Sequence, residues 1–254
     1  MTESRFSGKG SIYAQYRPTY PQAFIDYLFS DVGMSKSSSI ADIGSGTGIL
    51  TKQLLEEGCR VFAVEPNTDM RATAEATLSR FIGFISVKGT AECTTLESNS
   101  VDFVTVAQAF HWFDRRRFKA ECIRIVRPSG KVVLVWNNRD TACDLVRENE
   151  TVIRKYCPDF KGYSGGMDIG GDESVFHDFF DGAYESLIFS NDLELSEQGF
   201  IGRNLSGSYA PKQGDSHYPA YVDALRALFV KYSMNGLLIL PNKAYCYTGE
   251  IRRH

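Results

Sequence analysis

The chain has 254 residues, a formal net charge of −3 and a hydrophobic content of 43%, which suits one globular domain with a substantial core. The slight acidity argues against a nucleic-acid-binding surface. No secretory signal or 18-residue apolar run occurs, and six scattered cysteines lack a C-x-x-C pair. We therefore expect a cytoplasmic protein with reduced thiols, no metal centre, and neither nucleic acid nor a membrane as partner.

An aromatic segment precedes the first predicted helix. Residues 12–21 read I-Y-A-Q-Y-R-P-T-Y-P, and Pro21 then opens a helical pattern. We interpret residues 12–20 as a strap outside the sheet. It would either close over a bound ligand like a lid or serve as a structural tie.

The most informative stretch follows a first strand predicted over residues 37–42. The sequence I-A-D-I-G-S-G-T-G places Asp42 before three alternate glycines, and a helical pattern over 47–57 follows. Glycines permit a sharp turn and the close approach of a ligand, and a helix start offers free N–H groups. The order of strand, glycine turn and helix therefore predicts a nucleotide-type pocket.

The next strand pattern, residues 59–65, ends in an acid. Glu65 lies about 20 residues after the first glycine, where a carboxylate can accept both hydroxyls of a ribose. Further helices are predicted over 68–80, capped by Thr68, and over 115–126, capped by Asp114. Further strands are predicted over 84–88, 100–106 and 131–136. Alternating strands and helices predict a parallel, doubly wound sheet.

The pattern changes after residue 137. Helices fit residues 143–156, 198–206 and 221–232, strands fit 184–195, 237–240 and 244–251, and a glycine-rich loop at 162–171 suits a pocket rim. We interpret segments 137–182 and 196–236 as insertions that cover the carboxyl edge of the sheet. The expected organisation is one domain in three parts: a strap and helix (1–36), a binding core (37–137), and a cap with the last strands (138–254).

Four motifs in this order resemble class I S-adenosylmethionine-dependent methyltransferases. They are D-x-G-x-G-x-G with the acid at 65, G-T-A-E at 89–92, V-D-F-V-T-V-A-Q-A-F-H-W-F-D at 101–114, and R-P-S-G-K-V-V-L-V-W at 127–136. The run A-Q-A-F-H-W-F-D resembles the small-molecule branch, methyltransferase type 11, which includes trans-aconitate methyltransferase-like enzymes. The resemblance covers residues 10–137 and implies a Rossmann-like seven-stranded doubly wound α/β sheet. That sheet would be mostly parallel with an antiparallel edge strand, plus helical cap insertions.

The resemblance also implies a site for S-adenosylmethionine. The expected cofactor contacts are Tyr16, Arg17, Asp42, Gly44, Ser45, Gly46, Glu65, Pro66, Met70, Ala91, Glu92, Ala107 and Gln108. Asp42 would meet the ammonium or only brace the turn, and Met70 would flank the adenine or belong to the core. Family members often carry Asp where this chain has Thr90, so Thr90 or a backbone carbonyl would take over that adenine contact.

His111 and Trp112 are the candidate catalytic residues, because they follow the carboxyl end of the fourth strand. His111 would take a proton from an acceptor, orient it, or brace the loop, and Trp112 would wall the acceptor pocket or pack on the sheet. Arg203 and Lys212 of the cap are cations that would suit a carboxylate acceptor.

The expected activity is methyl transfer to a small-molecule acceptor, a carboxylate or a hydroxyl, by a monomer or homodimer. Two alternatives remain. One is a cofactor-binding protein of the same fold without transferase activity. The other is a nicotinamide-dependent oxidoreductase, whose G-x-G-x-x-G fingerprint would need a glycine in place of Ile49.

Overall fold

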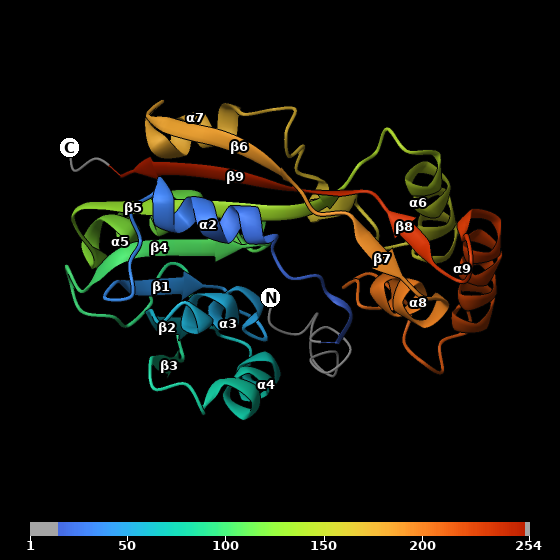
Figure 1. Ribbon diagram of the computed structural model, residues 1–254, viewed down its shortest axis with the longest axis horizontal. Coiled ribbons are helices and arrows are strands. Elements are labelled where there is room, and N and C mark those ends of the chain that lie inside the picture. The colour runs from blue at the N-terminus through green and yellow to red at the C-terminus, as the bar shows by residue number, and fades with distance from the viewer. Residues whose placement is uncertain (1–14, 252–254) are drawn as a thin grey trace.

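The structure, a computed structural model, describes residues 15–251, and its centre is a seven-stranded sheet (Figure 1). The strands lie in the order β3-β2-β1-β4-β5-β9-β6. Their bounds are β1 (Ser39–Ile43), β2 (Arg60–Val64), β3 (Phe84–Val87), β4 (Val101–Ala107), β5 (Val126–Arg139), β6 (Tyr184–Ser190) and β9 (Asn242–Glu250). Strands β1 to β5 are mutually parallel, and β9 is antiparallel to both β5 and β6. The predicted fold class is confirmed, and the antiparallel strand lies one position in from the edge.

Helices cover both faces of this sheet because its strands are apolar on both faces. On β5, Val133 and Val135 point to one side, whereas Val132, Leu134 and Trp136 point to the other, as the two-residue period of a strand requires. The helices on the first side are α2 (Gln22–Ser30), α3 (Ile49–Glu56) and α4 (Thr68–Leu78). Those on the second are α5 (Arg115–Ile125) and α7 (Ser174–Phe180).

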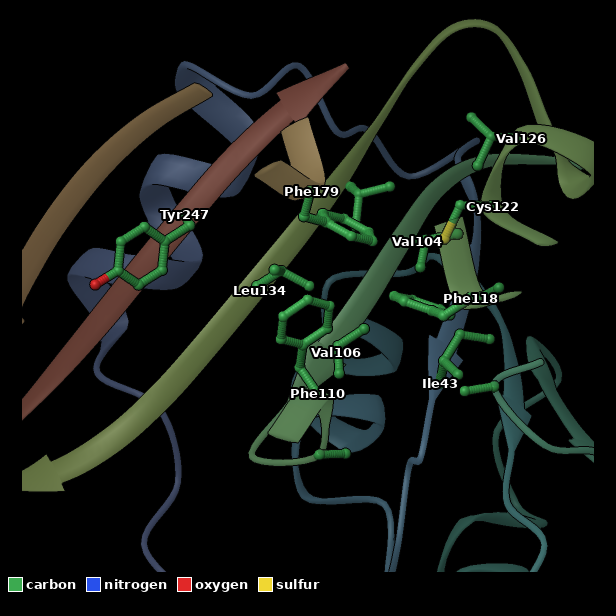
Figure 2. Close-up of a cluster of buried hydrophobic side chains, with 14 of the residues drawn as sticks. Ile43, Val104, Val106, Phe110, Phe118, Cys122, Val126, Leu134, Phe179 and Tyr247 are labelled. Atoms are coloured by element: carbon green, nitrogen blue, oxygen red, sulfur yellow. The ribbon is translucent and has the colours of Figure 1, made fainter. Parts of the chain in front are cut away.

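The second face carries a cluster of buried aromatic rings (Figure 2). Phe118 of α5 stacks on Phe179 of α7 with centroids 5.6 Å apart, and Phe110 meets Phe179 edge-on at 5.0 Å. Phe110 belongs to a short 3₁₀ turn, η2 (Phe110–Trp112), that directly follows β4. The residue that anchors this turn in the core is therefore the neighbour of the two candidate catalytic residues.

A separate cap lies beyond the carboxyl ends of the parallel strands, at the right of Figure 1. It consists of α6 (Asp144–Tyr156), α8 (Glu197–Leu205), α9 (Tyr218–Tyr232), β7 (Leu193–Leu195) and β8 (Leu238–Leu240), and the turn η3 (Tyr163–Gly166) follows α6 in the chain. The cap has a buried apolar cluster of its own. Strands β7 and β8 pair antiparallel in a second small sheet.

Several predicted boundaries need correction. The strand predicted over 184–195 is divided at Asn191 and Asp192 into β6 and β7, which belong to different sheets. The helix after the glycine turn begins at Ile49 because Gly48 has a left-handed φ of +82°. Asn67, not Thr68, caps α4 by accepting a hydrogen bond from the Met70 amide, whereas the predicted Asp114 cap of α5 is confirmed.

Between residues 15 and 251, no helix combines the length and the apolar character that crossing a bilayer requires. All six cysteines are free, and Cys59 and Cys122 are buried in the two sheet-face clusters.

Removing the Phe118 ring tests the packing of the second face. Phe118 is fully buried, so Phe118→Ala should lower the free energy of unfolding by about 3–5 kcal/mol, the sum of lost burial and a residual cavity. Ile82→Ala is the control because Ile82 is fully exposed, and it should change stability by less than about 0.5 kcal/mol. Urea unfolding of both variants measures this, and equal losses would contradict the assignment of the core.

Candidate functional site

The glycine turn between β1 and α3 is held in a left-handed conformation. Gly44 and Gly46 have φ angles of +68° and +58°. A Cβ atom on Gly44 would lie 2.7 Å from the Cβ of Ala109, whereas one on Gly46 would meet nothing within 4 Å. Gly44 is therefore required for packing against the segment after β4, while Gly46 faces open space where a ligand can approach the backbone.

Two acids support this turn from behind. Asp42 is buried, and its carboxylate accepts hydrogen bonds from Thr51 Oγ1 at 2.5 Å and Thr105 Oγ1 at 2.9 Å. Burial raises the pKa of Asp42 to about 6, against the opposing effect of both threonine bonds. Asp42 thus braces the turn and lines neither of the two neighbouring cavities, and its contact with the cofactor stays a prediction.

Glu65 directly follows β2 and is hydrogen-bonded to the glycine turn. Its Oε2 accepts from the Gly46 amide at 2.9 Å and its Oε1 from the Asn67 amide at 2.8 Å. Burial raises the pKa of Glu65, and the two amide bonds oppose that shift. Since each carboxylate oxygen has a second lone pair, Glu65 retains the capacity to accept bonds from ligand hydroxyls.

A small cavity of about 40 Å³ lies over the glycine turn. It is walled by Gly44, Ser45 and Gly46 from below and by Arg17 and Pro18 from the strap. The hydroxyls of Ser45 and of Thr47, which also lines the cavity, are buried without a hydrogen-bond partner among residues 15–251. Buried hydroxyls of this kind are suited to a polar ligand.

The strap is tied to both the core and the cap. The Tyr16 ring lies where a Cβ on Gly202 of α8 would fall, at 2.6 Å, and its hydroxyl accepts a bond from Gln198. Arg17 donates to the Ser206 carbonyl at 3.2 Å. Tyr16 therefore contacts the cap and lines neither the small nor the larger cavity, and its contact with the cofactor stays a prediction. Residues 12–14 of the expected lid lie outside the described residues.

A larger cavity of about 510 Å³ lies between the core and the cap. The core contributes Gln108, His111, Trp112 and Arg139 to its walls, and the cap side contributes Tyr163 and Arg203. Gly162 and Gly165 of the glycine-rich loop also line it, so this loop forms a pocket rim as the sequence suggested.

The two cavities share one wall. Arg17, Gln108, Asn137 and Arg203 line both of them. Gln108 has a positive φ of +60°. Two hydrogen bonds hold it in this conformation: its backbone amide donates to the Val135 carbonyl, and its side-chain amide donates to the Asn137 carbonyl. A strained, well-tied residue at a common wall is typical of a functional position.

His111 lies in the larger cavity between the Trp112 ring, 4.6 Å away, and the backbone of Gly165. Its Nδ1 accepts a long hydrogen bond from Trp136 Nε1 at 3.4 Å. Burial, and next the charge of Arg17, lower the pKa of His111 to about 4. The neutral ring with Nδ1 as acceptor carries its proton on Nε2, so it presents a donor and not a base.

Four of the remaining predicted contacts lie outside both cavities. Pro66, Met70, Ala91 and Glu92 line neither one, and Glu92 instead accepts a bond from the Asp114 amide at 3.0 Å. Ala107 lines the small cavity with the glycine turn. In the cap, Lys212 is exposed and away from both cavities, whereas Arg203 lines both.

Sequence reasoning missed Asn137, Arg139 and Tyr163. The first two lie beyond the predicted end of the fifth strand at Trp136, but β5 continues to Arg139 because β9 pairs with it throughout. Polar residues at the carboxyl end of a parallel strand were the available signal, since ligands bind at that edge.

Comparison with known proteins agrees with this architecture. Residues 41–134 match the profile of the methyltransferase domain family. An uncharacterized methyltransferase of Mycobacterium tuberculosis (strain H37Rv) is 40% identical over 148 residues, and one of Schizosaccharomyces pombe is 29% identical over 144. The first alignment covers 58% of both chains and the second 56% of both, so the chain spans a little over half the length of these relatives.

Solved structures show the same fold at low identity. The YcgJ protein of Bacillus subtilis has a TM-score of 0.60 at 16% identity, covering 92% of this chain and all of that one. Phosphoethanolamine N-methyltransferase 2 of Haemonchus contortus also has a TM-score of 0.60, at 13% identity, covering 99% of this chain and 60% of that one. The sheet order agrees with the fold of these structures, and residues 41–134 are similar to the methyltransferase domain family.

The depressed pKa of His111 predicts a measurable pH effect on stability. Between its ordinary 6.5 and about 4 the unfolded chain binds a proton that the folded protein excludes, so His111 destabilises the fold as the pH falls through this range. His111→Gln should therefore lose less unfolding free energy than the wild type between about pH 7 and pH 4.5.

Urea unfolding of both proteins at the two pH values measures this difference. The raised pKa of Asp42 acts in the opposite sense over part of this range, so the comparison of variant with wild type, and not the wild-type profile alone, isolates His111. Identical pH dependence in the two proteins would contradict a buried neutral histidine.

Proposed function

We propose that the protein transfers a methyl group from S-adenosylmethionine to a small-molecule acceptor. The observation that carries the proposal is the wall that the glycine-turn cavity and the larger cavity have in common. A donor on the glycine turn and an acceptor in the larger cavity would meet at Gln108 and Asn137. Methyl transfer depends on this kind of proximity and orientation more than on acid–base groups.

The residues around the glycine turn fit the donor. The partnerless Ser45 and Thr47 hydroxyls, the open space at Gly46 and the carboxylate of Glu65 offer polar contacts to an amino-acid portion and a ribose. When bound, S-adenosylmethionine supplies a methyl group activated by a positively charged sulfur. The Haemonchus contortus neighbour was solved with S-adenosylhomocysteine, which supports the same use of this fold here.

The strap has to move for the donor to bind. A cavity of about 40 Å³ is far below the roughly 300–1,000 Å³ of pockets that enclose small organic ligands. Arg17 and Pro18 of the strap line this cavity together with the turn, and outward movement of this short segment would enlarge the cavity without disturbing the sheet. This supports a lid function for the described part of the strap.

His111 and Trp112 are assigned to the acceptor. Trp112 walls the larger cavity, and the neutral His111 offers its Nε2–H to an acceptor oxygen. A carboxylate acceptor needs no deprotonation at neutral pH because its pKa is about 4, so a histidine that orients without acting as a base suits it. A hydroxyl acceptor would need a proton acceptor elsewhere.

Gly46→Ala tests the donor site, with Gly236→Ala as a matched control. Both glycines have positive φ, and a Cβ at either would meet nothing within 4 Å, so the two substitutions impose the same backbone strain. Only Gly46→Ala places a methyl group on the surface proposed for the donor. Its dissociation constant for S-adenosylmethionine should rise at least tenfold, about 1.4 kcal/mol, while Gly236→Ala keeps wild-type affinity.

Calorimetric titration measures both variants and the wild type. Wild-type affinity in Gly46→Ala would place the donor elsewhere, and absence of binding to the wild type would refute the proposed function. Methyl incorporation into a panel of carboxylates and alcohols separates a transferase from a protein that only binds the donor.

A further inference from the structure

Arg139 is a buried cation without an acidic partner. It lies at the carboxyl end of β5 with 6% of its surface exposed, and it lines the larger cavity. Its guanidinium stacks over the Tyr163 ring at 4.6 Å, and its Nη2 donates to Asn204 Oδ1 at a long 3.4 Å. Its Nε has no hydrogen-bond partner, and it forms no ion pair with any residue between 15 and 251.

A buried guanidinium in this state is costly to the fold. An arginine keeps its charge at any physiological pH, and burial without a counter-charge removes the hydration that stabilised it. Asn204 Oδ1 is also bonded by Asn149 Nδ2 at 3.0 Å, and the Tyr209 side chain is a second hydrogen-bond partner of Arg139. Both partners are neutral, and Nε has none, so the guanidinium has no counter-charge and keeps an unused donor.

The larger cavity carries an excess of positive charge. Arg17, Arg203 and Lys161 line it together with Arg139, and the acid in its lining, Asp159, is exposed on the rim. This excess of positive charge occurs in a chain whose formal net charge is −3. A positive, partly enclosed cavity in an acidic protein attracts and concentrates anions.

The Tyr163 hydroxyl adds a neutral donor beside the guanidinium. It is buried and has no hydrogen-bond partner among the described residues. Burial raises the pKa of Tyr163 to about 12, so the hydroxyl keeps its proton. Arg139 and Tyr163 lie side by side, with the guanidinium over the ring, and together offer donors and no negative charge, a combination that suits a carboxylate or phosphate oxygen.

Arg139 is set back from the wall that the two cavities share. Asn137 lines both cavities, whereas Arg139, two residues further along β5, lines only the larger one. Residues two apart on a strand point to the same face about 7 Å apart. An anion on Arg139 is thus about one such step away from the wall where the proposed methyl transfer occurs.

We propose that Arg139 and Tyr163 bind an anionic group of the acceptor, a carboxylate or a phosphate, that is separate from the atom receiving the methyl group. The proposal rests on the proposed function, and it makes the acceptor a molecule with at least two polar groups. The anionic group stays unmodified, so the methylated product still carries it.

Calorimetric titration at fixed ionic strength tests the proposal with succinate, inorganic phosphate and the neutral ester dimethyl succinate. The wild type should bind succinate or phosphate, and which of the two binds tells a carboxylate from a phosphate site. Arg139→Met should weaken that binding at least tenfold, and Tyr163→Phe, which removes only the hydroxyl, at least threefold. Arg226→Met, at an exposed arginine on α9 paired with Glu197 and Asp223, should bind as the wild type does.

Anion binding to Arg139→Met with wild-type affinity would overturn the proposal, as would equal binding of dimethyl succinate or no binding of either anion to the wild type. If Arg139→Met fails to fold, the loss in Tyr163→Phe decides. S-adenosylmethionine is titrated separately: if it fails to bind while the anion result holds, the proposed function is wrong and the anion site stands.

Discussion

The architecture of the site depends on the pairing of β5 with β9 beyond the point where β4 ends. Strand β4 leaves the ladder at Ala107 opposite Val135, but β9 continues to pair with β5 as far as Arg139 opposite Asn242. The extended ladder carries Asn137 and Arg139 past the end of β4 to the larger cavity between the core and the cap. Because backbone hydrogen bonds on β9 fix this segment, the walls of both cavities have a rigid base.

The extension also explains how the cap is joined to the core. Asn191 divides β6 from β7 and donates to the Thr19 carbonyl of the strap and to the Asn137 side chain. Asn137 donates to the same carbonyl at 3.2 Å. These three hydrogen bonds connect the strap, the sheet and the entry to the cap. A ligand that displaces the strap would break the two bonds to the Thr19 carbonyl, one of which comes from Asn191 between β6 and β7.

The sequence predicted those parts of the protein whose signal is local. The glycine turn, Glu65 at the end of β2 and the Asp114 cap depend on neighbouring residues, and all three lie where they were expected. The sequence did not predict features that depend on residues far away in the chain. Residues 137–139 are strand only because they pair with β9, which the local sequence does not indicate. The packing of Tyr16 against Gly202 of α8 likewise depends on a residue far along the chain. The sequence around Arg139 does not indicate that its charge lacks an acidic partner.

We propose that the methyl donor and the acceptor occupy adjoining cavities on either side of Gln108 and Asn137. A crystal structure of the protein with S-adenosylhomocysteine tests it most directly. We expect the amino-acid portion of S-adenosylhomocysteine over Gly44 to Gly46, its ribose at Glu65, and its sulfur at the shared wall facing the larger cavity. Density for the molecule in the larger cavity beside Arg139, with the glycine turn uncontacted, would contradict the account.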